Sequence, residues 1–272
     1  MSLTQTDAHR PVGVFDSGLG GLTVLSAIHR RLPGENLIYF GDTARVPYGS
    51  KSKETVIRYS LEILEFLLTK NVKYVVAACN TASSLALQEL RERSPVPVLG
   101  VVEPGVLALA RYDDTIDRAG VIATRSTIRS GAYEKTASRL LPSLSLFSKA
   151  CPMLVPMIEE GFLRKNITEL ILREYLDEIE REGIRHLILG CTHYPLLKET
   201  ITRLYPQFNL IDSSEETAVQ LEQDLTEKKL TGEKNNGRVN LFVSDITDSF
   251  RDMEKLFFGS ALHSVEKVVL GW

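Results

Sequence analysis

Residues 73–82 read KYVVAACNTA, and residues 185–195 read RHLILGCTHYP. Each stretch runs from a basic residue through an apolar segment to a small residue and a cysteine, which polar residues follow. A short uninterrupted apolar segment is typical of a strand buried on both faces, as in a parallel sheet covered by helices. Ligands of open α/β sheets bind beyond the carboxyl ends of the strands. Both Cys79 and Cys191 are therefore predicted at site-forming positions.

Strand-like and helix-like segments alternate along the rest of the chain. We predict strands at 12–15, 36–40, 74–78, 96–102, 120–123, 186–189, 210–211, 239–243 and 265–270. We predict helices at 22–31, 54–70, 82–93, 127–141, 167–182, 195–204, 213–229 and 247–258. Gly183 is expected to end a helix, Ser213-x-x-Glu216 to form a capping box, and residues 232–237 to form a loop. This alternation indicates an α/β protein, and the repeated cysteine pattern indicates a duplicated lobe.

Length and composition narrow the classes of protein. The chain has 272 residues, which suggests about two domains, and a formal net charge of −3. This balance offers no electrostatic reason to expect nucleic acid or an anionic membrane as a partner. Residues 1–13 contain no apolar signal segment, and no apolar stretch reaches the roughly 18 residues of a membrane span, so we expect a cytoplasmic protein. The three cysteines form no CxxC motif, which argues against a disulfide framework and against a metal site.

A glycine-rich loop, DSGLGG at 16–21, joins the first predicted strand to its helix. It resembles part of a dinucleotide fingerprint, and Asp42 stands where that fingerprint has its ribose-binding acid. However, Thr23 occupies the position of the third glycine, and Asp16 puts a carboxylate where pyrophosphate would lie. The backbone N–H groups at the helix start suit a smaller anion, such as a carboxylate. The alternative is that the glycines only permit a tight turn.

Cys79 stands between a predicted strand and a predicted helix. A helix N-terminus lowers the pKa of a thiol, so we expect the Cys79 pKa to lie below its usual range. Asn80 and Thr81 are expected either to cap the helix or to hold a ligand. Near the second cysteine, an imidazole follows two residues later, at His193. A Cys–His pair fits a hydrolase nucleophile, but that hypothesis leaves the first cysteine unexplained.

The remaining candidates are one cysteine and one carboxylate. Cys151 precedes Pro-Met without polar neighbours and is predicted to be structural. Glu159 lies between apolar residues and Gly161, so it either points into a cleft or is a solvated surface acid.

Two facing thiols suit one kind of reaction in particular. One thiolate can remove a proton from one face of a carbon atom while the other thiol donates a proton to the opposite face. This is racemisation without a cofactor, and a duplicated lobe supplies the two nearly mirror-image groups. No lysine occupies a strand end comparable to that of Cys79 or Cys191, so we expect no pyridoxal Schiff base and no cofactor.

Five motifs, spread in order over nearly the whole chain, resemble those of the glutamate racemases, in the aspartate/glutamate racemase superfamily. They are FDSGLGG at 15–21, PYG at 47–49, ACNTA at 78–82, TIRSGAYEK at 127–135 and GCTHYP at 190–195. The resemblance implies two pseudo-symmetric flavodoxin-like lobes with parallel sheets and an active site in the cleft between them. The expected lobes are residues 11–102 plus 212–272, with Cys79, and residues 103–211, with Cys191. The resemblance also implies that the protein interconverts L- and D-glutamate, which supplies D-glutamate for peptidoglycan. We further expect a homodimer, although no interface stripe is visible in the sequence.

The resemblance also assigns roles to residues. Cys79 and Cys191 would be the two acid/base groups, with Asp16 assisting the first and His193 and Glu159 assisting the second. Cys79, Cys191, Asp16 and His193 would also contact the amino acid. Its carboxylates and ammonium would be held by Ser17, Pro47, Tyr48, Gly49, Asn80, Thr81, Thr124, Thr127 and Thr192. One departure is that Ala123 replaces a glycine usual in the family and is followed, after Thr124, by Arg125.

Three alternatives remain open on the same scaffold. A non-enzymatic amino-acid-binding module would keep the anion-binding loops but has no use for paired thiols. An amino-acid decarboxylase of this kind uses one cysteine. An aspartate racemase differs in cleft length, which spacing in the sequence does not measure.

Overall fold

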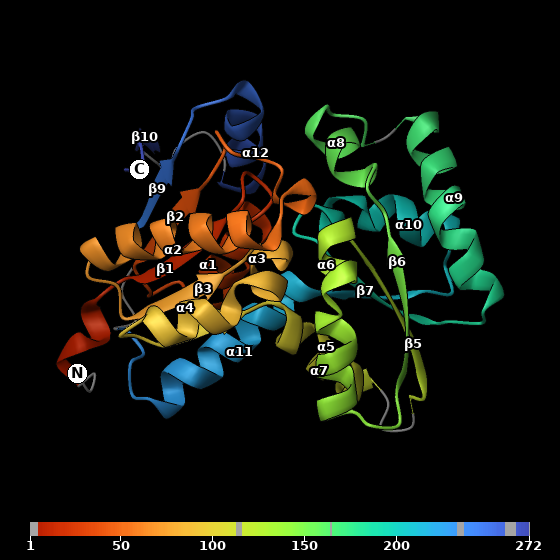
Figure 1. Cartoon of the computed structure of the whole chain (residues 1–272), viewed down its shortest axis with the longest axis horizontal. Helices are drawn as coiled ribbons and strands as arrows, with labels where there is room; N and C mark the ends of the chain where they lie inside the picture. Colours follow the sequence, from red (N-terminus) through yellow and green to blue (C-terminus); the bar gives the residue numbers. More distant parts are fainter. Residues whose placement is uncertain (1–4, 113–115, 164, 233–236, 259–264, 272) are drawn as a thin grey trace.

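The computed structural model describes residues 5–112, 116–163, 165–232, 237–258 and 265–271, and within them the strands form two separate sheets (Figure 1). The larger sheet has six strands in the order β10-β9-β2-β1-β3-β4, and the smaller has four in the order β6-β5-β7-β8. All pairings are parallel. The strands are β1 (Val12–Asp16), β2 (Leu37–Gly41), β3 (Tyr74–Ala77), β4 (Val98–Gly100), β5 (Arg118–Ala123), β6 (Ser145–Ala150), β7 (His186–Gly190), β8 (Asn209–Asp212), β9 (Val239–Val243) and β10 (Val265–Lys267).

The two sheets repeat one topology. The order β2-β1-β3-β4 in the larger sheet corresponds to β6-β5-β7-β8 in the smaller, and both follow the flavodoxin-like pattern 2-1-3-4. Cys79 follows β3 and Cys191 follows β7, so the two cysteines occupy equivalent positions. The predicted α/β fold with two parallel sheets is confirmed, and the repeated strand-then-cysteine pattern reflects a repeated sheet. The lobe boundaries expected at residues 102/103 and 211/212 stay a prediction.

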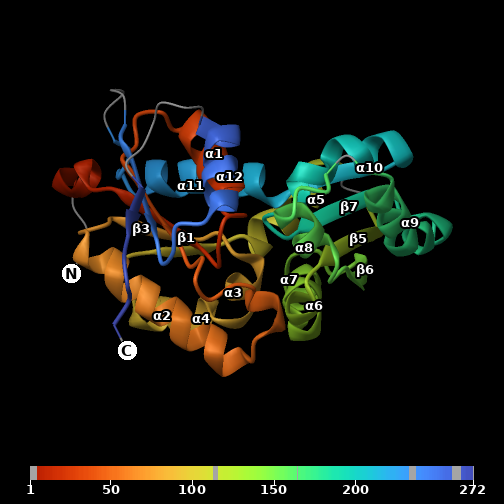
Figure 2. The ribbon, with the colours of Figure 1, turned by 90° about the horizontal axis from the view of Figure 1, so that it is seen from above.

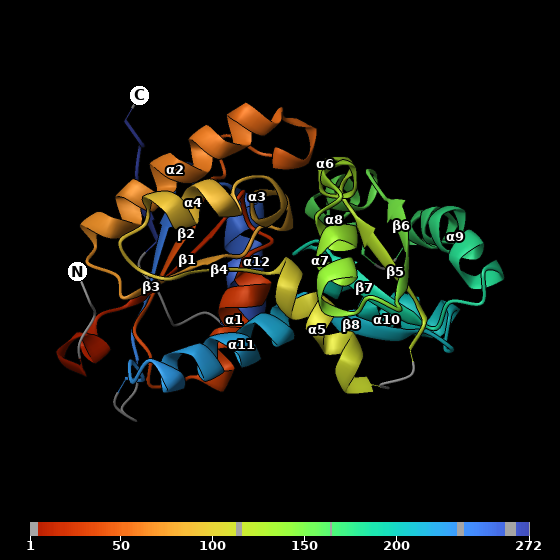
Figure 3. The same ribbon diagram turned by 60° about the horizontal axis from the view of Figure 1, so that its bottom comes forward.

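Helices cover both faces of each sheet (Figures 2 and 3). The α-helices are α1 (Leu22–Arg31), α2 (Lys53–Thr69), α3 (Asn80–Leu85), α4 (Leu87–Arg93), α5 (Val102–Tyr112), α6 (Arg125–Ser130), α7 (Ala132–Leu140), α8 (Leu154–Glu159), α9 (Asn166–Arg181), α10 (Lys198–Leu204), α11 (Ser213–Glu227) and α12 (Asp248–Phe258). Short 3₁₀ helices span Gln5–His9, Tyr48–Ser50 and Tyr194–Leu197. On the larger sheet, α1, α11 and α12 pack on one face and α2, α3 and α4 on the other. On the smaller sheet, α5 and α7 oppose α8, α9 and α10. None of the helices in the described ranges combines the length and the apolar character that a membrane-spanning segment requires.

Most residues of the central strands β1, β2, β3 and β7 are apolar because both faces of these strands are buried. Successive residues of a strand point to opposite sides of the sheet. Val14 and Tyr39 therefore enter the core beneath α1 and α11, while Phe15 and Phe40 enter the core beneath α2. A strand in this environment has no polar face, which is why the sequence shows apolar runs instead of an alternating pattern.

Two predicted helices are each divided in two. The helix expected at 82–93 is α3 followed by α4, with a break at Ala86, whose backbone (φ −123°, ψ −3°) is not helical. The helix expected at 127–141 is α6 followed by α7, separated by Gly131 at φ +64°. A glycine adopts this left-handed conformation without the steric cost that a side chain brings. Gly183 (φ +71°) ends α9 as predicted.

Other segments differ from the prediction for reasons of local chemistry. Val102, expected to end a strand, begins α5. Pro104 does not break this helix, because it lies in the first turn, where its missing N–H has no intrahelical partner to lose. Strand β6 and helix α8 were not predicted; β6 is an edge strand of mostly half-buried residues and carries little apolar signal. The segment expected to be helical from Pro195 begins as the 3₁₀ turn Tyr194–Leu197 and becomes α-helical only at α10.

The expected capping box at Ser213 is wrong. Asp212 is the N-cap residue of α11, and its side chain accepts a hydrogen bond from Ser214 N at 2.9 Å. Ser213 is already helical, and its hydroxyl donates to Leu189 O at 3.2 Å, which ties α11 to β7. The loop expected at 232–237 falls largely on residues 233–236, outside the described residues.

Candidate active site

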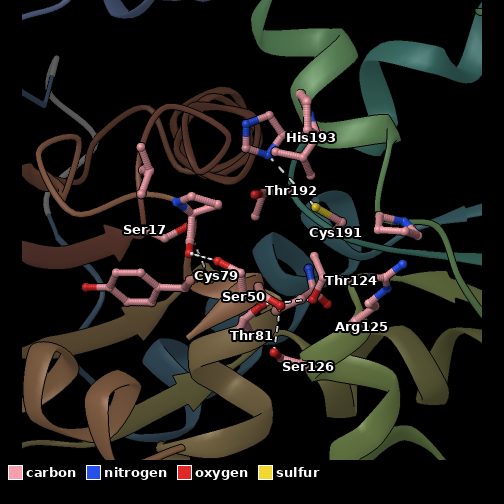
Figure 4. A pocket seen from close by; sticks show the side chains of 18 of the residues that line it. Ser17, Ser50, Cys79, Thr81, Thr124, Arg125, Ser126, Cys191, Thr192 and His193 are labelled. Carbon is pink, nitrogen blue, oxygen red and sulfur yellow. Dashed lines mark hydrogen bonds between the residues drawn. The ribbon is translucent and has the colours of Figure 1, made fainter. Parts of the chain in front are cut away.

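A cavity of about 490 Å³ is lined by residues that follow strands of both sheets (Figure 4). Figure 4 shows Cys79 and Ser17 on one side of the cavity and Cys191 and His193 on the other side. The residues named from the sequence that line it are Ser17, Pro47, Tyr48, Gly49, Cys79, Asn80, Thr81, Thr124, Glu159, Cys191, Thr192 and His193. Asp16 and Thr127 do not line the cavity; both are fully buried behind it.

On the side of the larger sheet, Cys79 is the N-cap residue of α3 and is 5% exposed. Its thiol donates a hydrogen bond to Ser17 Oγ at 3.5 Å. Burial raises the pKa of Cys79 to about 12, and the negative charge of Asp16 acts in the same direction. Hydrogen bonds with Ser17 and with the backbone N–H of Ala82 oppose this rise but are weaker. The expectation that the helix N-terminus lowers this pKa is therefore wrong, because desolvation outweighs the N–H groups.

On the side of the smaller sheet, His193 connects a thiol to a carboxylate. Its Nδ1 lies 3.9 Å from Cys191 Sγ, and its Nε2 lies 3.1 Å from Glu159 Oε1. Burial alone would lower the pKa of His193, but its hydrogen bonds and charge interactions with Cys191 and Glu159 prevail and raise it to about 10. His193 is therefore an imidazolium at neutral pH. Glu159 belongs to the cavity and is not simply a solvated surface acid.

Asp16 occupies the anion-binding position of its own loop. Gly18 N donates to Asp16 Oδ2 at 2.9 Å, and the Thr192 hydroxyl donates to Oδ1 at 3.4 Å. Burial raises the pKa of this carboxyl, while the positive charge of His193 and the hydrogen bonds from Gly18, Gly21 and Thr192 lower it in part. The expectation that the N–H groups of this loop hold a substrate carboxylate is not met at Gly18 and Gly21, since Asp16 already uses them.

The loops that follow β1 and β7 are in direct contact. The Thr23 hydroxyl lies 3.0 Å from Thr192 O, and Ser214 donates to Thr23 Oγ1 at 3.1 Å. A Cβ atom at Gly20 would lie 2.4 Å from His193 Nδ1 and 2.5 Å from Thr192 Oγ1. Glycine at position 20 therefore allows an approach that any side chain would prevent.

Three threonine hydroxyls gather where α3 meets α6. Thr81 Oγ1 lies 3.1 Å from Thr124 Oγ1 and 3.3 Å from Thr127 Oγ1, and the latter two are 3.0 Å apart. Thr124 is also the N-cap residue of α6, with its side chain accepting from Thr127 N. Despite its unusual neighbours in the sequence, Thr124 thus lies in the cavity wall, and Thr127 supports it from behind.

The PYG segment lies against α6, the helix that follows β5, and begins with a cis peptide bond between Val46 and Pro47. The Ser126 hydroxyl donates to Gly49 O at 2.7 Å. The Tyr48 hydroxyl donates to Asp42, which also accepts hydrogen bonds from Arg45 and Ser244. The Asp42 carboxylate is therefore fully engaged by protein side chains, so it is not available to bind a ribose.

Several lining residues were not anticipated. Lys51, Arg125 and Arg129 add positive charge to the cavity, and Glu160 adds a carboxylate. Cys151, expected to be structural only, is buried but also lines the cavity. The sequence did not mark these cations as cavity residues: Arg125 and Arg129 are exposed and lie four residues apart on α6, and Lys51 is half-buried on a distant segment. In the described ranges no cluster of three or more His, Cys, Asp or Glu side chains is arranged to hold a metal ion.

Comparison with known proteins relates this geometry to a family. Residues 12–221 match the family model of the Asp/Glu/hydantoin racemases. A glutamate racemase of Persephonella marina is 47% identical over 259 residues, which cover 95% of this chain and 97% of that protein. The crystal structure of glutamate racemase from Francisella tularensis in complex with D-glutamate superposes with a TM-score of 0.89 at 40% identity, covering 97% and 98% of the two chains. The structure of isoform RacE1 from Bacillus anthracis gives a TM-score of 0.92 at 38% identity, with the same coverage.

The family model spans well over half of the chain, and the relatives match nearly all of it. The chain belongs to the Asp/Glu/hydantoin racemase family.

Proposed function

We propose that the protein is a glutamate racemase that interconverts L- and D-glutamate with two cysteines and no cofactor, and so supplies D-glutamate for peptidoglycan. The observation that carries the proposal is the placement of Cys79 and Cys191 on one cavity, each after the third strand of its own sheet. A planar carbanion formed between two such thiols can be reprotonated on either face. The extensive similarity to glutamate racemases supports glutamate as the substrate.

The two thiols have different supporting groups, and we assign them different partners. Cys79 is held protonated by burial and by the negative charge of Asp16, so a base must take its proton before the thiolate can remove the α-proton. Asp16, whose own pKa is raised, would accept that proton. On the other side, the positive charge of His193 would stabilise negative charge on Cys191, while Glu159 holds the imidazolium in place. In each direction one thiolate removes the α-proton and the opposite thiol returns a proton.

An amino acid with two carboxylates suits the charge of the cavity. Lys51, Arg125, Arg129 and the imidazolium of His193 outnumber the lining carboxylates of Glu159 and Glu160. Hydroxyl and amide donors are supplied by Ser17, Asn80, Thr81, Thr124 and Thr192. We expect turnover of glutamate and little turnover of alanine or leucine. A rate on aspartate comparable to that on glutamate would favour the aspartate racemase alternative.

Solvent exchange in single-cysteine variants tests the two-thiol mechanism. L- and D-glutamate have equal free energy, so kcat/KM is the same in both directions for any variant and does not identify the thiol that faces each enantiomer. In D₂O, Cys191→Ala should label the α-carbon of D-glutamate through Cys79, and Cys79→Ala should label L-glutamate through Cys191. Both should lose racemisation by about 10²–10⁴-fold, the usual effect of removing an acid/base group.

Cys151→Ala is the matched control, because Cys151 is a third thiol on the same cavity and has no assigned role. It should racemise glutamate at a rate close to that of the unchanged protein. Exchange of the same enantiomer by both single variants contradicts the mechanism, as does racemisation by either at the original rate. Binding of glutamate without exchange or racemisation in the unchanged protein would favour the binding-module alternative.

A further inference from the structure

Tyr133 contacts the candidate active site without lining it. It lies in α7, on the smaller sheet, within the TIRSGAYEK motif, and is 1% exposed. Its hydroxyl donates a hydrogen bond of 2.7 Å to Oδ1 of Asn80, which lies in α3 on the larger sheet. This buried side-chain contact thus joins helices of the two sheets immediately beside Cys79.

Asn80 lines the cavity and is 2% exposed. Its acceptor atom Oδ1 is engaged by Tyr133, while its donor atom Nδ2 is buried and has no hydrogen-bond partner among the described residues. An amide has one acceptor end and one donor end, and which end faces a neighbour is decided by the hydrogen bonds it makes. A buried N–H group without a partner is costly, so it indicates a position at which a ligand supplies the acceptor.

We propose that Tyr133 is a positioning residue that holds the Asn80 amide with Nδ2 available to a carboxylate of the substrate. The inference rests on the proposed function, because it takes an amino-acid carboxylate as the acceptor. A carboxylate can only accept hydrogen bonds. Without the Tyr133 hydroxyl, the amide can rotate by half a turn and present Oδ1, which repels a carboxylate. Tyr133 therefore discriminates between a productive and an unproductive orientation of one side chain.

The tyrosine is suited to act as a constant donor. Burial raises its pKa, and the nearby charge of Cys191 acts in the same direction. The hydroxyl therefore keeps its proton while the cysteines exchange theirs, and the orientation of Asn80 does not change during the reaction.

Tyr133→Phe removes the hydroxyl and keeps the ring. We expect KM for both enantiomers, and the dissociation constant of D-glutamate measured by calorimetry, to rise by roughly tenfold, as for loss of one oriented hydrogen bond. The value of kcat should change by no more than about threefold, because this donor serves substrate and transition state alike. In an Asn80→Ala background, Tyr133→Phe should have no further effect on KM, since its action passes entirely through Asn80.

Tyr205→Phe is the matched control. Tyr205 is also 1% exposed, and its hydroxyl donates a hydrogen bond to Asp177. Neither Tyr205 nor Asp177 lines the cavity. Its loss should lower the midpoint of thermal unfolding without changing KM. An unchanged KM in Tyr133→Phe, or equal effects of that substitution with and without Asn80, overturns the inference.

The unchanged protein is assayed first, so that the two proposals fail separately. If it neither binds nor racemises glutamate, both the proposed function and the role of Tyr133 are wrong. If it does both and Tyr133→Phe binds D-glutamate equally well, only the role of Tyr133 is wrong.

Discussion

Replacing Gly20 by alanine tests whether racemisation depends on the close approach of the loops that follow β1 and β7. The new Cβ atom would lie 2.4 Å from His193 Nδ1 and 2.5 Å from Thr192 Oγ1, whereas ordinary van der Waals contact begins at 3.4 Å. The side chains of His193 and Thr192 must therefore move away from position 20 by about 1 Å, together with the segment that carries them. The shift moves His193 relative to Asp16 and carries the adjacent Cys191 with it. A misplacement of about 1 Å costs about 10²-fold in rate, so kcat/KM for glutamate should fall by about that factor.

The assay follows the optical activity of glutamate from both enantiomers, with thermal unfolding measured in parallel. Gly105→Ala is the control, because it makes the same chemical change in α5, where the nearest atoms to a new Cβ are 3.6 Å away. That variant should keep its activity, and it should gain stability, since alanine is favoured over glycine in a helix by up to about 1 kcal/mol. Undiminished kcat/KM in Gly20→Ala, with the fold intact, would refute the view that this contact sets the distance between the two thiols.

Three further predictions concern charge. The interactions of His193 with Cys191 and Glu159 together raise its pKa to about 10, and Glu159→Gln weakens the contribution of Glu159. The imidazolium is then lost at lower pH, so the alkaline limb of the kcat/KM profile should move to lower pH. An unmoved limb would show that His193 does not set it. Arg125→Gln removes a positive charge from the cavity lining, so kcat/KM for glutamate should fall several-fold at low ionic strength. The loss should be much smaller in 1 M salt, where the screening length is about 3 Å. A loss that does not depend on salt would exclude electrostatic attraction of glutamate by Arg125. Glu35→Gln leaves the buried Lys73 ammonium without the carboxylate that lies 2.5 Å away, so the free energy of unfolding in denaturant should fall by about 3–5 kcal/mol. Glu35 and Lys73 precede β2 and β3, at the end of the sheet opposite the cavity, so kcat/KM should be unchanged. A loss of kcat/KM that accompanies the loss of stability would contradict the independence of this ion pair from the active site.

Local patterns in the sequence were sufficient for the class of fold and for the position of the cysteines. Apolar runs predict strands buried on both faces, because a strand between two layers of helices has no polar side. The repeated strand-then-cysteine pattern predicted a repeated lobe, and Cys79 and Cys191 do follow equivalent strands. Helix ends were predicted less well, since Gly131 and Pro104 act through a backbone angle and a position within the first turn.

What only the tertiary structure decided is which side chains meet and how strongly each is buried. The Tyr133–Asn80 hydrogen bond and the contact of Gly20 with His193 join residues from different sheets, and no spacing along the chain encodes their distance. The same holds for the pKa of Cys79, which burial raises although its place at a helix N-terminus suggested the opposite. Helix starts and apolar periodicity depend on residues a few positions apart and can be read from the sequence. Desolvation and contact depend on segments that are distant in the chain, so they arise only when those segments come together in the folded protein.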